Sequence, residues 1–279
     1  MKLMRKKPPI DAVAGERSPL GVAISVAEGA TLDLVRAAIA SKRLRLAYQP
    51  VVLAKDPARV AFYEGLMRVL EPSGRVIPAK DFMTTVETTE LGRKIDCAAL
   101  ELGLKALAKR EDLRLSVNMS ARSIGYSPFM DLLRRGLAAA PTIGERLILE
   151  ISESSAMLMP EIVAAFMEEV QMAGVAFALD DFGSGQFAVR HFKEFCFDIV
   201  KLDGRYLRGL DRDPGNRAVA MALLAIGRSF EMFTVANAIE TPAEAAILQQ
   251  MGVDCMQGYL FGAPSLKPSF EQEAARIPA

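Results

Sequence analysis

Short apolar runs alternate with longer helix-like stretches from about residue 30 to near the end of the chain. The apolar runs predict eight strands, at residues 45–50, 60–66, 113–118, 146–151, 175–180, 197–201, 233–237 and 253–257. The stretches between them predict helices, among them 32–40, 79–110, 161–173, 216–230 and 242–251. Eight strands with intervening helices over about 240 residues predict an α/β fold, a TIM-like (β/α)8 barrel.

The connection between the first two predicted strands is too short for a regular barrel. Only about nine residues separate Pro50 from Val60, whereas a parallel crossover needs about a dozen or more. We therefore expect these two strands to be antiparallel, so that one strand near the start of the barrel runs backwards.

The two ends of the chain differ from this pattern. Residues 1–28 contain Lys2, Arg5, Lys6 and Lys7, two adjacent prolines and no sustained hydrophobic period. This composition predicts a basic, flexible N-terminal arm outside the core. The barrel is expected to occupy residues 29–270, followed by a C-terminal tail at 271–279.

Charge and hydropathy exclude several classes of function. Thirty-four Lys and Arg balance thirty-four Asp and Glu, so no net charge favours a nucleic acid polymer as partner. The longest apolar run, 218–227, is far shorter than the 18 or so residues of a transmembrane segment. The N-terminus has cations but no apolar signal-peptide region, which predicts a cytoplasmic protein.

The chain has one histidine, His191, and three cysteines without CxxC spacing. These counts argue against a zinc site and against a Ser-His-Asp triad. His191 itself is expected to serve packing or to face solvent. Any catalysis must therefore use carboxylates, amides and lysine.

Polar side chains occur at or near the ends of the predicted strands: Gln49, Glu64, Asn118, Glu150, Asp180, Lys201, Asn237 and Gln257. In a barrel, such positions meet at one mouth. Four carboxylates, of Glu64, Glu150, Asp180 and Asp181, together with the Asn118 carbonyl oxygen suit Mg²⁺ or Mn²⁺. A pair of such cations about 3.5–4 Å apart can hydrolyse phosphodiesters.

Eight short motifs, in order, resemble those of EAL domains, the bacterial phosphodiesterases and receptors for cyclic di-GMP. They are YQPVV (48–52), EGLMR (64–68), SVNMS (116–120), LEISES (149–154), DDFGSG (180–185), VKLD (200–203), ANAIET (236–241) and QGYLFGAP (257–264). The resemblance covers roughly residues 30–268 and implies a (β/α)8 barrel with an antiparallel strand near its start.

The resemblance implies a role for each matching residue. A first cation would be held by Glu64, Asn118, Glu150 and Asp180, and a second by Asp180 and Asp181. The resemblance further implies that Lys201 contacts the attacking water, whereas Asp203, Glu240 and Gln257 line the metal and phosphate site. The dinucleotide would contact Gln49, Leu66 and Arg68, and Glu153 would hold the DDFGSG loop. Arg68 has an independent rationale, because a planar guanidinium suits phosphate.

One departure from the family bears directly on catalysis. Where the family motif reads A-E-G-V-E, this chain has Ala236, Asn237, Ala238, Ile239 and Glu240. The first glutamate is the family's candidate general base and second-metal ligand, and an amide cannot accept a proton at ordinary pH. We therefore expect slow hydrolysis and reduced occupancy of a second cation site. Phe187 and Ala188 also replace small polar residues after the DDFG loop.

Three functions remain open at this point. The chain is expected to be a cyclic di-GMP receptor with weak or absent hydrolysis, which its intact nucleotide and first-metal residues favour. Alternatively it is an active metal-dependent phosphodiesterase that yields the linear dinucleotide pGpG. A third alternative is a protein-interaction scaffold that binds no nucleotide. The resemblance also raises a homodimer or another protein as partner.

Overall fold

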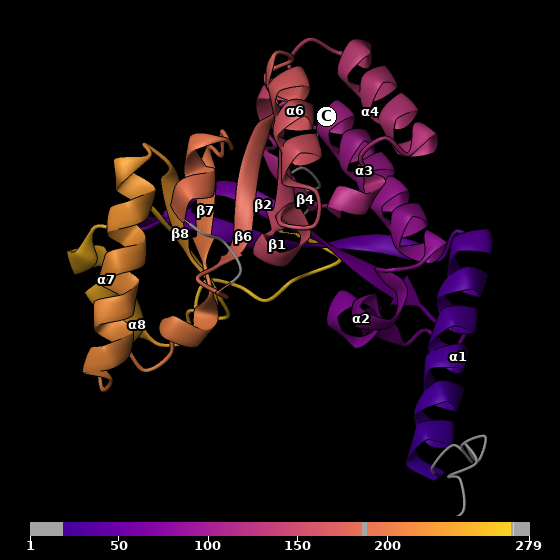
Figure 1. Ribbon diagram of the computed structural model, residues 1–279, viewed down its shortest axis with the longest axis horizontal. Helices are drawn as coiled ribbons and strands as arrows, with labels where there is room; N and C mark the ends of the chain where they lie inside the picture. The colour runs from indigo at the N-terminus through magenta and orange to yellow at the C-terminus, as the bar shows by residue number, and fades with distance from the viewer. Residues whose placement is uncertain (1–18, 186–188, 269, 271–279) are drawn as a thin grey trace, which may run out of the picture.

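The computed structural model describes residues 19–185, 189–268 and 270 (Figure 1). The strands of this part are β1 (Leu44–Leu53), β2 (Asp56–Leu70), β3 (Val76–Pro78), β4 (Leu115–Asn118), β5 (Leu147–Ser152), β6 (Ala176–Phe182), β7 (Ile199–Leu202), β8 (Phe233–Ala236) and β9 (Cys255–Gln257). They form one sheet in the order β1-β9-β8-β7-β6-β5-β4-β2-β3, and pairing of β1 with β2 closes it. The predicted barrel is confirmed, with β3 as an additional edge strand on β2.

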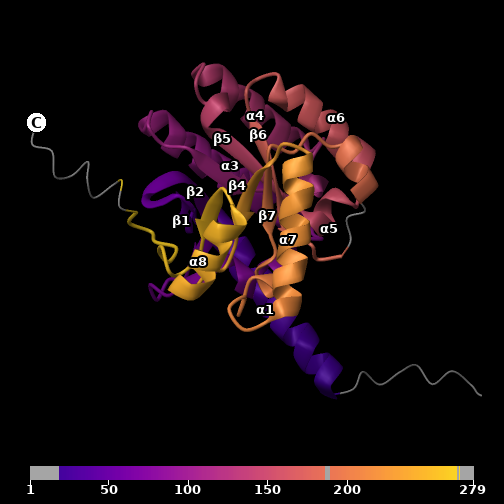
Figure 2. The ribbon, with the colours of Figure 1, turned by 90° about the vertical axis from the view of Figure 1, so that its left-hand side faces the viewer.

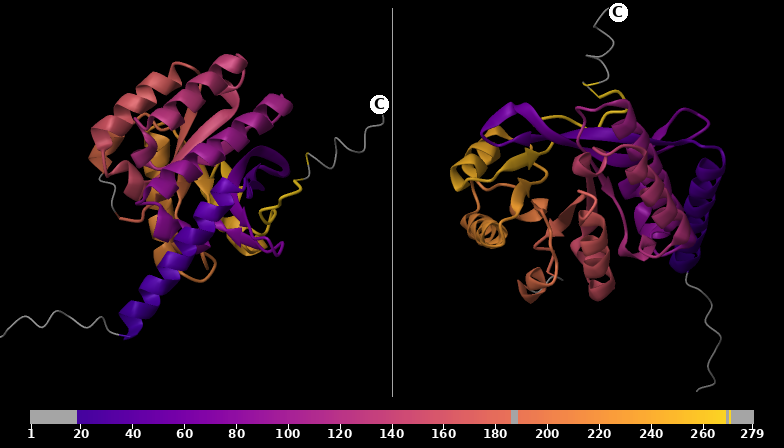
Figure 3. Two further views of the ribbon diagram at one scale, coloured as in Figure 1. Left: turned by 90° about the vertical axis from the view of Figure 1, so that its right-hand side faces the viewer. Right: turned by 90° about the horizontal axis from the view of Figure 1, so that it is seen from above.

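The direction of the first strand is also confirmed. Strand β1 is antiparallel to both of its neighbours in the barrel, β2 and β9, whereas β2 and β4 to β9 pair in parallel from one neighbour to the next. The long β1–β2 hairpin runs along one side of the barrel (Figure 3). Its register places Gln49 opposite Glu64.

The helices lie around the outside of the barrel (Figure 2). Those described are α1 (Pro19–Ala40), α2 (Met83–Val86), α3 (Glu90–Lys109), α4 (Ser127–Ala139), α5 (Glu153–Ala156), α6 (Pro160–Gln171), α7 (Pro214–Ser229) and α8 (Pro242–Met251). Short 3₁₀ turns are η1 (Ala79–Asp81), η2 (Ala121–Ser123), η3 (Gly144–Arg146), η4 (Val189–Lys193) and η5 (Gly204–Tyr206). Proline in the first turn of α4, α6, α7 and α8 agrees with its missing N–H.

The single helix predicted at residues 79–110 is wrong. This stretch contains η1, α2 and α3. Thr89 is extended, with φ −102° and ψ 173°, and its side chain accepts a hydrogen bond from the backbone N–H of Leu91. An N-cap of this kind starts a new helix and interrupts any helix that approaches from the N-terminal side.

The last ten residues of the predicted N-terminal arm, 19–28, are helical. Helix α1 begins at Pro19, and its first half extends beyond the barrel (Figures 1 and 3). Residues 22–28 are exposed, whereas Val35 and Ala38 in the second half are fully buried. Packing of the second half on the barrel stabilises the helix. The rest of the arm, 1–18, and the tail, 271–279, lie outside the described residues.

The barrel interior has an apolar layer beneath a polar one. The apolar layer consists of Val51, Phe62, Ile148, Ala178, Ile199, Val235 and Cys255. Each of these apolar residues has a polar residue two positions away in the sequence. The polar residues are Gln49, Glu64, Glu150, Asp180, Lys201, Asn237 and Gln257. Since side chains at i and i+2 share a face of a strand, the polar set lies directly above the apolar layer. A larger apolar core joins the outside of the sheet to the helices.

No helix among the residues that the structure describes combines the length and the hydropathy of a transmembrane segment.

Candidate functional site

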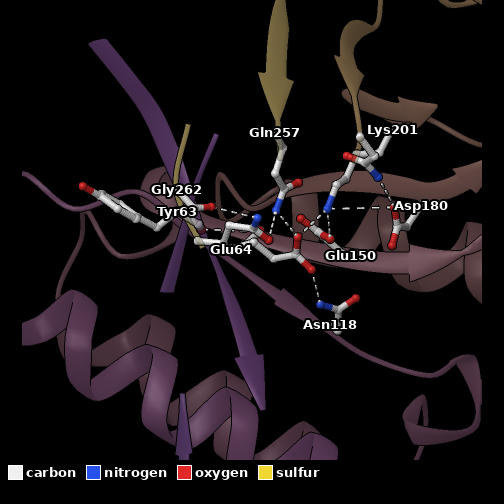
Figure 4. Close-up of polar contacts among 11 residues, drawn as sticks. Tyr63, Glu64, Asn118, Glu150, Asp180, Lys201, Gln257 and Gly262 are labelled. Atoms are coloured by element: carbon white, nitrogen blue, oxygen red, sulfur yellow. Dashed lines mark hydrogen bonds and ion pairs between the residues drawn. The ribbon is translucent and has the colours of Figure 1, made fainter. Parts of the chain in front are cut away.

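The centre of the polar layer is the buried ammonium group of Lys201, which is 1% exposed. Its Nζ donates hydrogen bonds to Glu150 Oε2 at 2.7 Å and Glu64 Oε2 at 2.8 Å, and lies 3.9 Å from Asp180 Oδ1 (Figure 4). Strands β2, β5, β6 and β7 therefore bring three carboxylates around one positive charge.

Amide side chains complete this cluster on the side of β1, β4 and β9. Glu64 Oε1 accepts a hydrogen bond from Asn118 Nδ2 at 2.8 Å, and Glu64 Oε2 accepts one from Gln257 Nε2 at 2.6 Å. Gln257 also donates to Gln49 Oε1 at 3.2 Å, and Gln49 donates to the carbonyl of Gly262 at 3.1 Å. Figure 4 shows these contacts as one continuous network.

The cluster has more negative than positive charge. Burial raises the pKa of Glu150 to about 8, and the neighbouring charges of Glu64 and Asp180 add to this shift, whereas Lys201 opposes it. Burial disfavours the Lys201 ammonium, but Asp180, Glu150 and Glu64 together hold its pKa well above the ordinary value. An added cation would therefore favour the ionised form of Glu150.

The cluster contains oxygen atoms of the type that hard divalent cations prefer. Glu150 Oε1 and Gln257 Oε1 are buried without a hydrogen-bond partner, and such atoms need an explanation in a folded protein. Within residues 19–185, 189–268 and 270, however, no three His, Cys, Asp or Glu side chains have the arrangement of a ligand set. Lys201 Nζ lies between Glu64 and Glu150, so a cation here would share both carboxylates with that ammonium group.

Asn237, directly after β8, contacts the cluster at Asp180. Its Nδ2 donates to Asp180 Oδ1 at 3.1 Å, and its buried Oδ1 has no hydrogen-bond partner. The next residue, Ala238, has φ 59°, a left-handed conformation in which a Cβ is unfavourable. The position expected to carry the general base thus carries a hydrogen-bond donor.

The loop after β6 is held by Glu153 from helix α5. Glu153 Oε2 accepts hydrogen bonds from the backbone N–H of Gly183 at 2.9 Å and of Ser184 at 3.2 Å. Asp181, near the end of β6, is exposed and left-handed, with φ 56°. The substitutions Phe187 and Ala188 lie outside the described residues.

Asp203, after β7, is buried but paired within its own turn. Its Oδ1 accepts a hydrogen bond from the backbone N–H of Arg205 at 2.8 Å. Its Oδ2 accepts from Arg205 Nε at 2.8 Å and lies 2.6 Å from Nη2. The Asp203 carboxylate is therefore held by a guanidinium group that is otherwise exposed.

Not every predicted site residue joins the cluster. Glu240 is exposed, and its backbone N–H donates to Glu244 Oε2 at 3.1 Å. No contact found among the described residues connects the Glu240 carboxylate with Lys201 or Asp180. Leu66 and Arg68 lie further along β2 and are half-buried, with Arg68 donating to the carbonyl of Met67 at 2.9 Å.

A cavity of about 710 Å³ opens beside the cluster. Its lining includes Glu64, Asn118, Asp180 and Asp181, together with Leu66 and residues of α2 and α3. This volume lies within the usual range of small-molecule sites, about 300–1,000 Å³. Part of the cluster thus borders a pocket large enough for a ligand.

Four further charged residues of this cavity, Lys80, Glu87, Asp96 and Arg122, were missed by the sequence analysis. Asp96 is 4% exposed, and its Oδ2 accepts hydrogen bonds from Ser123 Oγ at 2.6 Å and the Ser120 N–H at 2.9 Å. A signal was present, because Asp96 lies between Ile95 and Ala99 on the buried face of α3. A charge on an apolar helix face indicates a buried polar contact.

We expect Asp96→Asn to change the pH dependence of stability. Burial raises the pKa of Asp96 from 3.8 to about 7. At pH values between 3.8 and about 7 the folded state keeps a proton on Asp96 that the unfolded state releases. The contribution of Asp96 to the free energy of unfolding therefore falls as pH rises and is lost above about pH 7. The free energy of unfolding of the native chain should therefore fall, relative to Asp96→Asn, by about 2 kcal/mol between pH 5.5 and 8.

Urea denaturation at both pH values measures this difference. The exposed Asp33→Asn is the matched control and should show no such change. A pH-independent difference between Asp96→Asn and the native chain would contradict the assignment.

Comparison with known proteins identifies a family match and several relatives of this chain. A model of the EAL domain family matches residues 33–264. The chain is 29% identical over 235 residues to the bifunctional diguanylate cyclase/cyclic di-GMP phosphodiesterase MucR of Pseudomonas aeruginosa. It is 26% identical over 242 residues to the cyclic di-GMP phosphodiesterase PdeR of Escherichia coli. These matches cover 82% and 85% of the chain but 34% and 36% of the relatives, so it spans about a third of their length.

Two solved structures have the same fold. The MucR phosphodiesterase in complex with c-di-GMP is 28% identical, with a TM-score of 0.73, and the match covers 85% of this chain and 97% of that one. The c-di-GMP-bound EAL domain of FimX from Pseudomonas aeruginosa has a TM-score of 0.76 at 24% identity, over 85% of this chain and 96% of that one.

Proposed function

The chain belongs to the EAL domain family, and from this premise we propose that it is a receptor for cyclic di-GMP that hydrolyses the nucleotide slowly or not at all. Retention of the carboxylate cluster beside the cavity supports binding. The choice of nucleotide is supported by the solved structure of the MucR phosphodiesterase. That protein is 28% identical to this chain and is described as a c-di-GMP complex.

One contact carries the proposal of weak hydrolysis. Asn237 Nδ2 donates to Asp180 Oδ1 at 3.1 Å, at the position where the family motif has a glutamate. An amide oriented in this way has no carboxylate that could accept a proton from water. We therefore assign the retained acidic residues to ligand binding.

A divalent cation belongs to this proposal, since EAL phosphodiesterases are generally divalent-metal dependent. Mg²⁺ or Mn²⁺ would be held by Glu64, Asn118, Glu150 and Asp180. A bound cation would supply positive charge next to a ligand phosphate. Gln49, Leu66 and Arg68 are proposed to contact the dinucleotide, with Arg68 on a phosphate.

A working phosphodiesterase that forms pGpG is the second candidate function. It is favoured by the other charged residues that the family resemblance assigns to the site. Glu64, Glu150, Asp180 and Lys201 are all present and close together. A nucleotide-independent scaffold is less supported, since such a protein has no need for clustered carboxylates. A cytoplasmic location, a homodimer and a further protein partner remain predictions from the sequence.

Calorimetry and a turnover assay on one sample test the proposal. We expect cyclic di-GMP to bind with a dissociation constant of about 1 μM or below, near −8 kcal/mol, with Mn²⁺-supported turnover close to background. Arg68→Ala is expected to weaken binding. Absence of binding heat with Mg²⁺, Mn²⁺ or Ca²⁺ would exclude both nucleotide functions, and fast cleavage by the native chain would favour the phosphodiesterase.

A further inference from the structure

We propose that the side of the site around Asp180, Asp181 and Asp203 takes no second divalent cation, because Asn237 and Arg205 supply the hydrogen bonds and positive charge in its place. The inference rests on the proposed function and extends it. It assigns a positioning role to Arg205, which the family resemblance did not single out.

The first support is the direction of the Asn237 hydrogen bond. Asp180 Oδ1 accepts from Asn237 Nδ2 at 3.1 Å and also lies 3.9 Å from Lys201 Nζ. A carboxylate that bridged two cations through its two oxygens would need this oxygen for one of them. A glutamate at position 237 would instead place a like charge beside Asp180, a repulsion that a second cation resolves.

The second support is the pairing of Asp203. Both of its carboxylate oxygens accept hydrogen bonds from Arg205, one from the backbone N–H and one from the guanidinium group. Arginine stays charged at all accessible pH values, and its planar fork matches a carboxylate. The same positive charge acts electrostatically on Asp181. Arg205 thus provides a permanent cation on this side of the site.

The third support is that the two segments touch. A Cβ built on Gly204 would lie 2.7 Å from the Cβ of Ala238. Gly204 precedes Arg205, and Ala238 follows Asn237, so the turn after β7 packs directly against the end of β8. The turn that carries Arg205 therefore lies against the residue that follows Asn237.

Mn²⁺ titration in the absence of nucleotide tests this inference, with electron paramagnetic resonance and native mass spectrometry to count bound ions. We expect the native chain to bind one Mn²⁺ tightly. Asn237→Glu should bind a second Mn²⁺, with an affinity at least about 10-fold above any residual affinity of the native chain for a second ion. Adding Arg205→Ser to Asn237→Glu should tighten the second site further. Asn237→Gln, equal in length but neutral, should behave like the native chain.

Two Mn²⁺ ions of comparable affinity on the native chain would overturn the inference. So would an equal gain in Asn237→Gln, or no second ion in the Asn237→Glu, Arg205→Ser double variant. If these variants fail to fold, the Asp181→Asn variant is titrated with Mn²⁺ instead. It should bind as many Mn²⁺ ions as the native chain, and a smaller number of bound ions would overturn the inference. Binding of cyclic di-GMP to the same native sample is measured independently by calorimetry. Failure of the receptor function can therefore be distinguished from failure of this inference.

Discussion

In the Asn237→Glu variant, Mn²⁺-supported hydrolysis of cyclic di-GMP is expected to rise by about 10²- to 10⁴-fold over the native chain. The gain is the usual contribution of one positioned general base, because the new carboxylate can accept a proton that the Asn237 amide cannot. The other acidic groups of the site, those of Glu64, Glu150 and Asp180, are already in place. Turnover is measured as formation of the linear dinucleotide under saturating ligand and Mn²⁺.

Two further variants separate chemistry from backbone geometry. Asn237→Gln has the length of glutamate without its charge and should leave turnover near background. Adding Ala238→Gly to Asn237→Glu removes a Cβ from a residue at φ 59°, a strain of about 1–2 kcal/mol, and should not lower the gain. An unchanged rate in both Asn237→Glu variants, with ligand still bound, would show that Asn237 is not what limits hydrolysis.

The barrel could be predicted from sequence because its interior repeats one local pattern. Ile148 and Glu150, or Ile199 and Lys201, are pairs in which an apolar residue precedes a polar one by two positions. A spacing of two keeps both side chains on the same face of a strand. When several strands share this pattern, closure of the sheet alone stacks a charged layer on an apolar layer. The short connection before Val60 then fixes the antiparallel hairpin.

Contacts between distant segments could not be predicted in this way. The sequence marks Asn237 as a replaced glutamate, but that its amide donates to Asp180 depends on the side-chain orientation in the folded barrel. Arg205 carries no periodic signal, and its pairing with Asp203 arises from a tight turn. Glu240 fits a family motif, yet its side chain is exposed beside the capping box of α8.

Lys201→Met is expected to lower the free energy of unfolding by about 3–5 kcal/mol in EDTA at neutral pH. Methionine is similar to lysine in length, so the change removes a charge and little volume. The lost ammonium group leaves the buried Glu64 carboxylate without its neighbouring positive charge, and Glu150 loses a hydrogen-bond donor. For a chain of this size the expected fall in Tm is about 10 °C, at 2–4 °C per kcal/mol.

The cost should depend on the carboxylates and on pH. Glu150→Gln alone should cost little at neutral pH, since burial already raises the pKa of Glu150 to about 8. Without the ammonium the carboxyl pKa values rise further in the folded state, which then binds more protons than the unfolded state. The cost of Lys201→Met should therefore be smaller at pH 5 than at pH 8. A cost below about 1 kcal/mol in EDTA at both pH values would mean that the carboxylates need no buried ammonium, and the electrostatic account of the cluster would fail.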